Sequence, residues 1–209
     1  MLPLDTLVTF FGLSLVLGFT PGPDNLFVLM QSAAHGRQAG LLVVLGLCTG
    51  LLLQTAAVAL GLAAVFAASA AAFTVLKVLG AAYLVYLAWQ AWRAPAGRPG
   101  DGNQGPRASP AQLVGRGIVM NLTNPKVVLF FLAFLPQFVE PQRGSVAMQL
   151  AALGLVFIAA TLLAFGAITY LAGFIGQLLR SSARAQRLMN RAAALVFLGL
   201  AARLALAQR

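Results

Sequence analysis

Two stretches of sequence decide the fold: GFTPGPDNLFVLM at positions 18–30 and MNLTNPKVVLFF at positions 120–131. Each stretch carries a proline inside a long apolar run, at Pro23 and at Pro125. Proline removes a backbone hydrogen bond from a helix and clashes with the preceding turn. Each stretch therefore predicts a helix that is interrupted and then restarts.

The composition around these stretches is typical of a membrane protein. Of the 209 residues, 60% are hydrophobic and 9% are charged, and the mean hydropathy is +0.89. Soluble domains carry roughly 25% charged residues, and an exterior this apolar would not be stable in water. The sequence therefore predicts an all-α integral membrane protein whose apolar exterior faces lipid.

Apolar runs of about 20 residues, the length that crosses a bilayer, divide the chain into about six predicted spans. Their bounds are 4–34 with a break at 20–23, 41–64, 66 or 73 to 92, 113–138 with a break at 124–125, 146–175, and 192–207. A break in a spanning helix persists only where the freed backbone groups are buried in protein or line a wet cavity. Both breaks fall near the middle of their spans, so a site at mid-membrane depth is expected.

The basic residues of the loops predict the orientation of the chain. Those in the odd-numbered loops are Arg37, then Arg93, Arg98, Arg107 and Arg116, then Arg180, Arg184, Arg187 and Arg191. By the positive-inside rule these loops are cytoplasmic and both termini lie outside, although Arg203 and Arg209 near the C-terminus count weakly against it. Charge that is spread over short loops without interleaved aromatic residues does not indicate nucleic-acid binding.

The two breaks resemble each other when the chain is laid on itself with an offset of 102 residues. Pro23 then aligns with Pro125, and Asp24 aligns with Lys126. With three spans in each half, the halves would have opposite orientations, which predicts an inverted repeat. The expected division is a first repeat at 1–92, a basic cytoplasmic loop at 93–112 and a second repeat at 113–209. Interrupted helices at matched positions of an inverted repeat indicate the central site of a secondary transporter.

The residues at each break suit a helix start. Gly22 and Asn124 are favourable N-cap residues, and proline is favourable at the first helical position. A helix start inside the membrane presents N–H groups and a positive dipole end, which attract a carboxylate.

Asp24 suits such an end, whereas Lys126 needs a nearby anion. An unpaired charge at the bilayer centre costs at least about 2.5–3.5 kcal/mol on insertion scales. Two interpretations stay open. The two residues form an ion pair that only fixes helix packing, or they bind an amino acid. In the second case Lys126 and the helix ends hold the carboxylate, and Asp24 holds the ammonium or a coupling proton.

Other polar residues inside the spans support either of two roles. Lys77 could snorkel to the membrane interface or take part in function. Gln54, Thr55, Tyr83, Tyr86 and Asn121 could line a cavity, or they could simply bond neighbouring helices.

Four motifs, in this order, carry a family resemblance: GFTPGPDNLFVLMQSAAHGRQAG, GLCTG, KVLGAAYLVYL and MNLTNPKVVLFFLAFLPQF. They resemble the LysE/RhtB (lysine exporter / homoserine-threonine exporter) family over nearly the whole chain. The resemblance implies a multi-pass protein of the bacterial inner membrane that exports amino acids by means of the proton motive force. The positions it implicates are Pro21, Gly22, Pro23, Asp24, Lys77, Asn121, Asn124, Pro125 and Lys126.

The resulting expectation is a proton-coupled exporter that works by alternating access. Its expected substrate is a small neutral or homoserine/threonine-type amino acid, with basic amino acids or another small metabolite as alternatives. A membrane-embedded enzyme would need a nucleophile with a base, or a metal-ligand cluster, and an assembly factor would need no polar residues at the midplane. The expected partners are the amino acid, protons and lipid, with no cofactor and no metal, and a homodimer is left open.

Overall fold

The computed structural model describes residues 2–68, 70–93, 108–174 and 183–206, and most of these residues are helical. The α-helices are α1 (Leu4–Phe19), α2 (Pro23–His35), α3 (Arg37–Ala68), α4 (Ala70–Arg93), α5 (Pro110–Thr123), α6 (Pro125–Leu129), α7 (Val146–Tyr170) and α9 (Ala183–Leu206). Between α6 and α7 the chain forms a π-helical turn, η1 (Phe130–Phe134), and two 3-10 turns, η2 (Leu135–Phe138) and η3 (Pro141–Arg143).

The described helices confirm an all-α membrane protein. Residues 37–61 of α3, all of α7 and residues 187–206 of α9 are each long and apolar enough to cross a bilayer. Two bent helix pairs raise the number of such spans to as many as five. The 24-residue α4 is the remaining long segment, and at 1.5 Å per residue it is about 36 Å long.

The predicted interruptions by proline are confirmed. The α1/α2 pair bends by 63° at its break, and the pair formed by α5 and the segment 125–138 bends by 50°. Pro23 and Pro125 are the first residues of α2 and α6. The sequence did not predict that α6 would last only five residues before passing into η1 and η2. Pro136 lies in η2, where its missing N–H prevents continuation of the α-helical bonds.

Helix ends differ from the predicted spans where arginine residues lie. α3 begins at Arg37 instead of 41, and α9 begins at Ala183 instead of 192. Arginine keeps its head group in water while its stem covers apolar surface, so a helix can extend past its apolar core through such residues. The apolar runs of the sequence predicted the membrane-embedded part of each helix. They did not predict the arginine-containing turns at the starts of α3 and α9.

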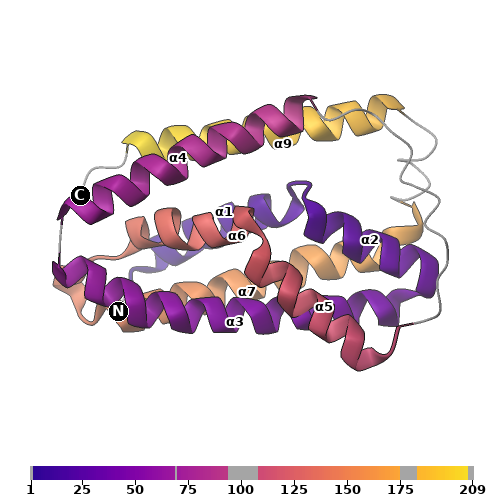
Figure 1. Ribbon diagram of the computed structural model, residues 1–209, viewed down its shortest axis with the longest axis horizontal. Coiled ribbons are helices and arrows are strands. Elements are labelled where there is room, and N and C mark those ends of the chain that lie inside the picture. Colours follow the sequence, from indigo (N-terminus) through magenta and orange to yellow (C-terminus); the bar gives the residue numbers. More distant parts are fainter. Residues whose placement is uncertain (1, 69, 94–107, 175–182, 207–209) are drawn as a thin grey trace.

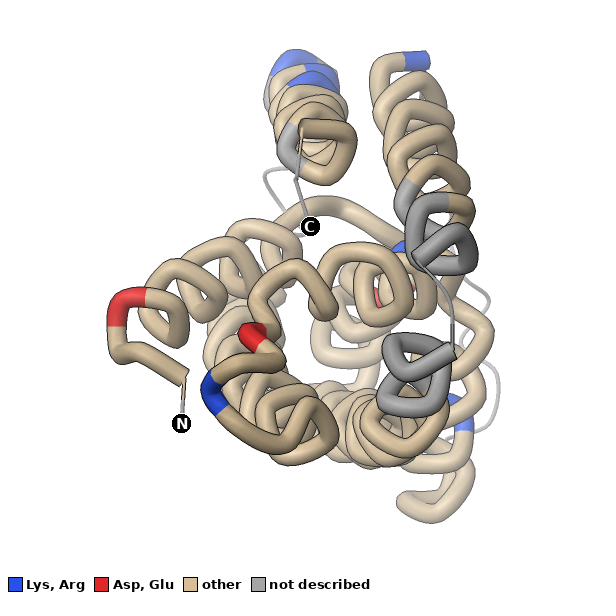
Figure 2. The backbone as a smooth tube through the Cα atoms, turned by 90° about the vertical axis from the view of Figure 1, so that its left-hand side faces the viewer, with Lys and Arg blue, Asp and Glu red and all other residues tan. Residues whose placement is uncertain are grey.

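The helices form a main bundle with a separate pair above it. Figure 1 shows α4 and α9 side by side along the top, over the bundle of α1, α2, α3, α5, α6 and α7. The end-on view of Figure 2 shows the same separation. The start of α1 and the end of α9 lie at one end of the long axis, and α2, α5, the end of α4 and the start of α9 lie toward the other.

The packing pattern fits an inverted repeat. Corresponding helices run in opposite directions in Figure 1: α1 and α2 against α5 and α6, α3 against α7, and α4 against α9. α3 packs on α5 as α7 packs on α1, and α3 also contacts α7 while α4 contacts α9. When corresponding helices of the two halves are exchanged, the contact of α3 with α5 becomes the contact of α7 with α1. The contacts of α3 with α7 and of α4 with α9 stay the same. The contacts between the two halves are thus arranged symmetrically, whereas the contact of α2 with α3 has no counterpart of similar extent between α6 and α7.

An aromatic cluster fills the half of the bundle nearer the termini. The ring of Phe10 on α1 meets the ring of Phe138 edge-on at 5.0 Å, and Phe130 stacks on Phe134 at 4.7 Å. Phe157 on α7 lies 5.2 Å from Phe130. Such contacts stabilise a dry core, and this one joins α1 and α7 to the segment that follows the second break.

The turn between α2 and α3 explains two glycines of the sequence motifs. Gly36 has a φ of +87°, a backbone conformation that other residues rarely adopt. A Cβ at Gly40 would overlap Oγ of Ser32. The first glycine permits the turn, and the second permits α3 to approach α2 closely.

Candidate functional site

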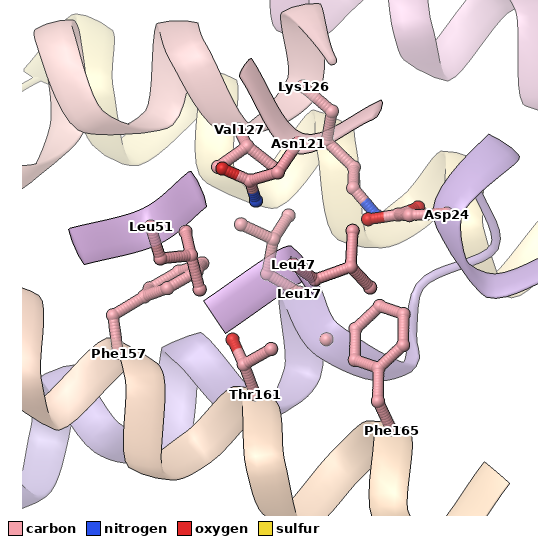
Figure 3. Close-up of a pocket in the computed structure, with 11 residues that line it drawn as sticks. Leu17, Asp24, Leu47, Leu51, Asn121, Lys126, Val127, Phe157, Thr161 and Phe165 are labelled. Carbon is pink, nitrogen blue, oxygen red and sulfur yellow. The ribbon is translucent and has the colours of Figure 1, made fainter. Parts of the chain in front are cut away.

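The two breaks meet at a buried ion pair in the middle of the protein. Asp24 lies in the first turn of α2, and Lys126 is the second residue of α6. Nζ of Lys126 is 3.3 Å from Oδ1 of Asp24, and each side chain is 5% exposed. Figure 3 shows Lys126 reaching toward the Asp24 carboxylate beside the α7 side chain of Phe165. Residues 102 positions apart in the sequence thus share one site.

Lys126 is surrounded by oxygen atoms. Besides Asp24, its Nζ donates to the backbone oxygen of Thr20 at 3.2 Å and to Oδ1 of Asn25 at 3.4 Å. An ammonium group has three N–H donors, so these three oxygens can use all of them. A new anion at Lys126 would therefore have to displace one of these oxygens.

Asn25 holds the first break together. Its Nδ2 donates to the backbone oxygen of Gly18 at 2.6 Å, and its backbone N–H donates to Oδ1 of Asp24 at 3.0 Å. Asn25 and Lys126 thus donate to two carbonyl groups at the end of α1, those of Gly18 and Thr20. The site that binds Lys126 is built almost entirely from the first half of the chain.

The second break uses a different set of bonds. Oδ1 of Asn124 accepts from the backbone N–H of Lys126 at 3.1 Å, as expected of an N-cap. Nε2 of Gln54 on α3 donates to the backbone oxygen of Asn121 at 3.1 Å. Oδ1 of Asn121, Nδ2 of Asn124 and Oε1 of Gln54 are buried and make no hydrogen bond to the described residues. Because buried polar groups are normally paired, these atoms indicate a place for water or a ligand.

A small cavity adjoins the ion pair inside the bundle. It measures about 20 Å³ and is lined by Asp24, Lys126 and Asn121 together with Thr161 and apolar side chains of α1, α3 and α7. That space holds about one water molecule. An amino acid does not fit there, so a substrate would have to reach the pair from another side.

A larger groove reaches Lys126 from the side of α4 and α9. It measures about 440 Å³, a volume typical of small-molecule sites. Its floor consists of the two breaks, and its roof consists of the C-terminal half of α4 and the N-terminal half of α9. The lining residues are Pro21, Gly22, Pro23, Leu26, Tyr83, Leu87, Gln90, Ala91, Asn124, Pro125, Lys126, Asn190, Ala193 and Phe197.

The structure thus brings together eight of the nine positions implicated by the sequence. Six of them line the groove, and Asp24 and Asn121 line the small cavity with Lys126. Lys77 lies in α4, but its side chain is outside the part that the structure describes. The described residues hold no group of three or more His, Cys, Asp or Glu side chains that could bind a metal.

Sequence reasoning left out several residues of this site, among them Asn25, Gln90 and Asn190. Asn25 directly follows Asp24 in the PGPDN motif, so its place at a matched break was a usable signal. Gln90 and Asn190 lie in the groove lining, but they come from helices that carry no break and no matched motif. Of the weaker candidates, Tyr83 lines the groove, whereas the hydroxyl of Thr55 donates to the backbone oxygen of Leu51 on its own helix.

Comparisons with known proteins agree on one family. The profile of the LysE type translocator family matches residues 15–208. A leucine efflux protein of Klebsiella pneumoniae is 30% identical over 191 residues, which cover 90% of this chain and 89% of the relative. A homoserine/homoserine lactone efflux protein of Salmonella typhimurium is 33% identical over 137 residues, 66% of each chain. An uncharacterized membrane protein of Vibrio cholerae is 32% identical over 89% of each chain. No solved structure matches the chain.

Proposed function

The chain belongs to the LysE type translocator family, and on that premise we propose that it exports an amino acid from the cytoplasm in exchange for protons. It is a multi-pass protein of the bacterial inner membrane. The relatives named for efflux of leucine and of homoserine make neutral amino acids the first candidates. The observation that carries the proposal is the buried Asp24–Lys126 pair at the junction of the two broken helices.

The pair offers complementary groups for the two charges of an amino acid. The substrate carboxylate displaces an oxygen from Lys126, and the substrate ammonium binds Asp24. Breaking a buried ion pair without replacing its partners is unfavourable, because it leaves buried charge uncompensated. A zwitterion that inserts between the two residues keeps both charges paired, so the site favours molecules that carry both groups.

A proton and the substrate compete for Asp24 in this mechanism. Protonated Asp24 has no charge for the substrate ammonium, and ionised Asp24 does. Export therefore proceeds with Asp24 ionised and the amino acid bound. The return step proceeds with Asp24 protonated and the site empty of substrate, while the oxygens of Thr20 and Asn25 hold Lys126. That mutual exclusion exchanges one proton inward for each substrate outward.

The asymmetry of the described packing supports alternating access. The groove opens at the halves of α4 and α9 near Gln90 and Asn190, whereas the opposite half is closed by contact of Gly80 with Ala133 and Leu204. The basic residues gather toward the open end, which we assign to the cytoplasm by the positive-inside rule. The repeats at 1–92 and 113–209 then rock around the ion pair to open the other end. A reporter fused between Arg93 and Pro110 should be active only as a cytoplasmic reporter.

The export activity itself has a direct test. Cells that lack native amino-acid exporters are loaded with dipeptides, and the efflux of each released amino acid is followed with and without this protein. Faster efflux of at least one amino acid is expected, and dissipating the proton gradient should remove the acceleration. If neutral, basic and sulfur-containing amino acids all leave at the control rate, the proposal is wrong.

A further inference from the structure

The groove beneath α4 and α9 is lined mostly by apolar and uncharged residues. A site that bound only the charged groups of a substrate would not need such a lining. We propose that this groove receives the side chain of the transported amino acid and that Gln90 is a residue that determines specificity. The inference rests on the proposed export function, because it assumes that the substrate's charged end lies at Lys126.

The position of the groove fixes which end of the substrate it can hold. Lys126 lines both the groove and the small cavity beside Asp24, so a molecule whose charged end engages the pair extends its remainder into the groove. The small cavity holds no more than about one water molecule. A second described groove, of about 690 Å³, lies beside Arg116 and Pro125, but Lys126 does not line it. The groove beneath α4 and α9 is therefore the described space that both adjoins Lys126 and is large enough for a side chain.

The lining of the groove selects a neutral side chain. Among the described residues that line it, Lys126 is the only one with a charge, and Leu26, Leu87, Ala193 and Phe197 give it apolar walls. A lysine or arginine substrate would bring a cation into this space without an anion to meet it. A desolvated, unpaired charge is strongly unfavourable, so basic amino acids are rejected.

Gln90 controls this selectivity because of where it lies. It is on the last turns of α4, in the groove lining, and its Nε2 donates to the hydroxyl of Tyr86 one turn earlier. Glutamate has the same length and can accept a hydrogen bond from the same hydroxyl, so Gln90→Glu adds a charge with little change of shape. The described roof is further held by Arg191 of α9, which lies over the Trp92 ring at 5.5 Å.

The test uses the purified full chain in liposomes loaded with equal concentrations of leucine, homoserine, phenylalanine and lysine. The wild-type protein is expected to release the neutral amino acids and little lysine. Gln90→Glu should raise the ratio of lysine to leucine release about ten-fold, the effect of one charge-assisted hydrogen bond. The matched control is Gln38→Glu on α3. Gln38 is exposed, as Gln90 is, but it lies outside the groove, so this variant should leave the ratio unchanged.

A second variant tests the same groove without charge. Leu87→Ala widens it and should raise the ratio of phenylalanine to leucine release. Either shift supports the inference. If neutral release persists and neither ratio changes, or if the wild-type protein releases lysine as fast as leucine, the groove is not the side-chain site. A wild-type protein that releases no amino acid would instead overturn the proposed export function.

Discussion

The first and second breaks differ in ways that their matched sequences conceal. The first is followed by the 13-residue α2 and the second by the five-residue α6. The first break supplies the three oxygens around Nζ of Lys126, whereas the second supplies the lysine and the cap of Asn124. The first repeat therefore provides the oxygens that bind a cation, and the second repeat provides the cation, the ammonium group of Lys126.

This difference has an electrostatic reason. A carboxylate near the start of a helix is stabilised by the helix dipole, and a lysine there is destabilised. Each break presents a positive helix end, because α2 carries Asp24 in its first turn and Lys126 is the second residue of the helical segment 125–138. Asp24 is therefore stabilised by its own helix, whereas Lys126 depends on the oxygens of the first break. The comparison suggests that the charges cannot be exchanged between the breaks without loss.

The largest effect is expected from removing the anion of the first break. Asp24→Asn should lower amino-acid efflux at least about 100-fold, because the ammonium and the proton lose their common partner. The remaining buried Lys126 charge should also cost about 3–5 kcal/mol of unfolding free energy. Efflux and the amount of protein in the membrane are measured together.

A double variant separates folding from transport. Asp24→Asn with Lys126→Met removes both buried charges, so the membrane level should recover while efflux stays absent. If the double variant exports normally, the pair serves helix packing alone.

The exchanged pair, Asp24→Lys with Lys126→Asp, tests the asymmetry of the two breaks. It restores opposite charges across the two breaks but removes the lysine from its position among the oxygens of Thr20 and Asn25. We expect stability to recover part of the loss seen with Asp24→Asn, and efflux to remain below about a tenth of the wild-type rate. Wild-type efflux from the exchanged protein would show that the two breaks are equivalent.

A substitution at Gly80 tests the close contact between α4 and η1, the turn that follows the second break. A Cβ at this position would overlap Cβ of Ala133 in η1, so Gly80→Val should push α4 away from the bundle. Overpacking of this kind typically costs about 1–3 kcal/mol, and efflux should fall several-fold. Gly61→Val is the matched control, because a Cβ there meets no atom within 4 Å. Equal losses in both variants would contradict the claim that the contact between α4 and η1 matters for efflux.

The smallest effect is expected at the cap of the second break. Asn124→Ala removes the acceptor for the backbone N–H of Lys126 and should cost about 1 kcal/mol of unfolding free energy. Thr123→Ala changes an exposed neighbour on the same helix end and should cost less. Unfolding in denaturant of both variants in the same detergent measures the difference.

The sequence predicted the breaks and the residues on them, because proline and buried charge have strong local consequences. It also predicted that Lys126 needed an anion, and Asp24 was one of two candidates. It did not predict Asn25 and Thr20 as further ligands of Lys126, since side-chain and backbone contacts across 100 residues depend on how two bends face each other. Gln90 was missed for a related reason. It lines the groove only because α4 packs beside α9 over the two breaks, and no local sequence pattern predicts that packing.

The central claim is that a proton and an amino acid compete for Asp24. The most direct measurement is proton movement in liposomes that contain the purified protein and a pH indicator, started by adding an exported amino acid to one side. Wild-type protein should move protons opposite to the amino acid, in a fixed ratio, and Asp24→Glu should keep this coupling. Asp24→Asn should show no coupled movement; coupled proton and amino-acid movement through Asp24→Asn would contradict the account.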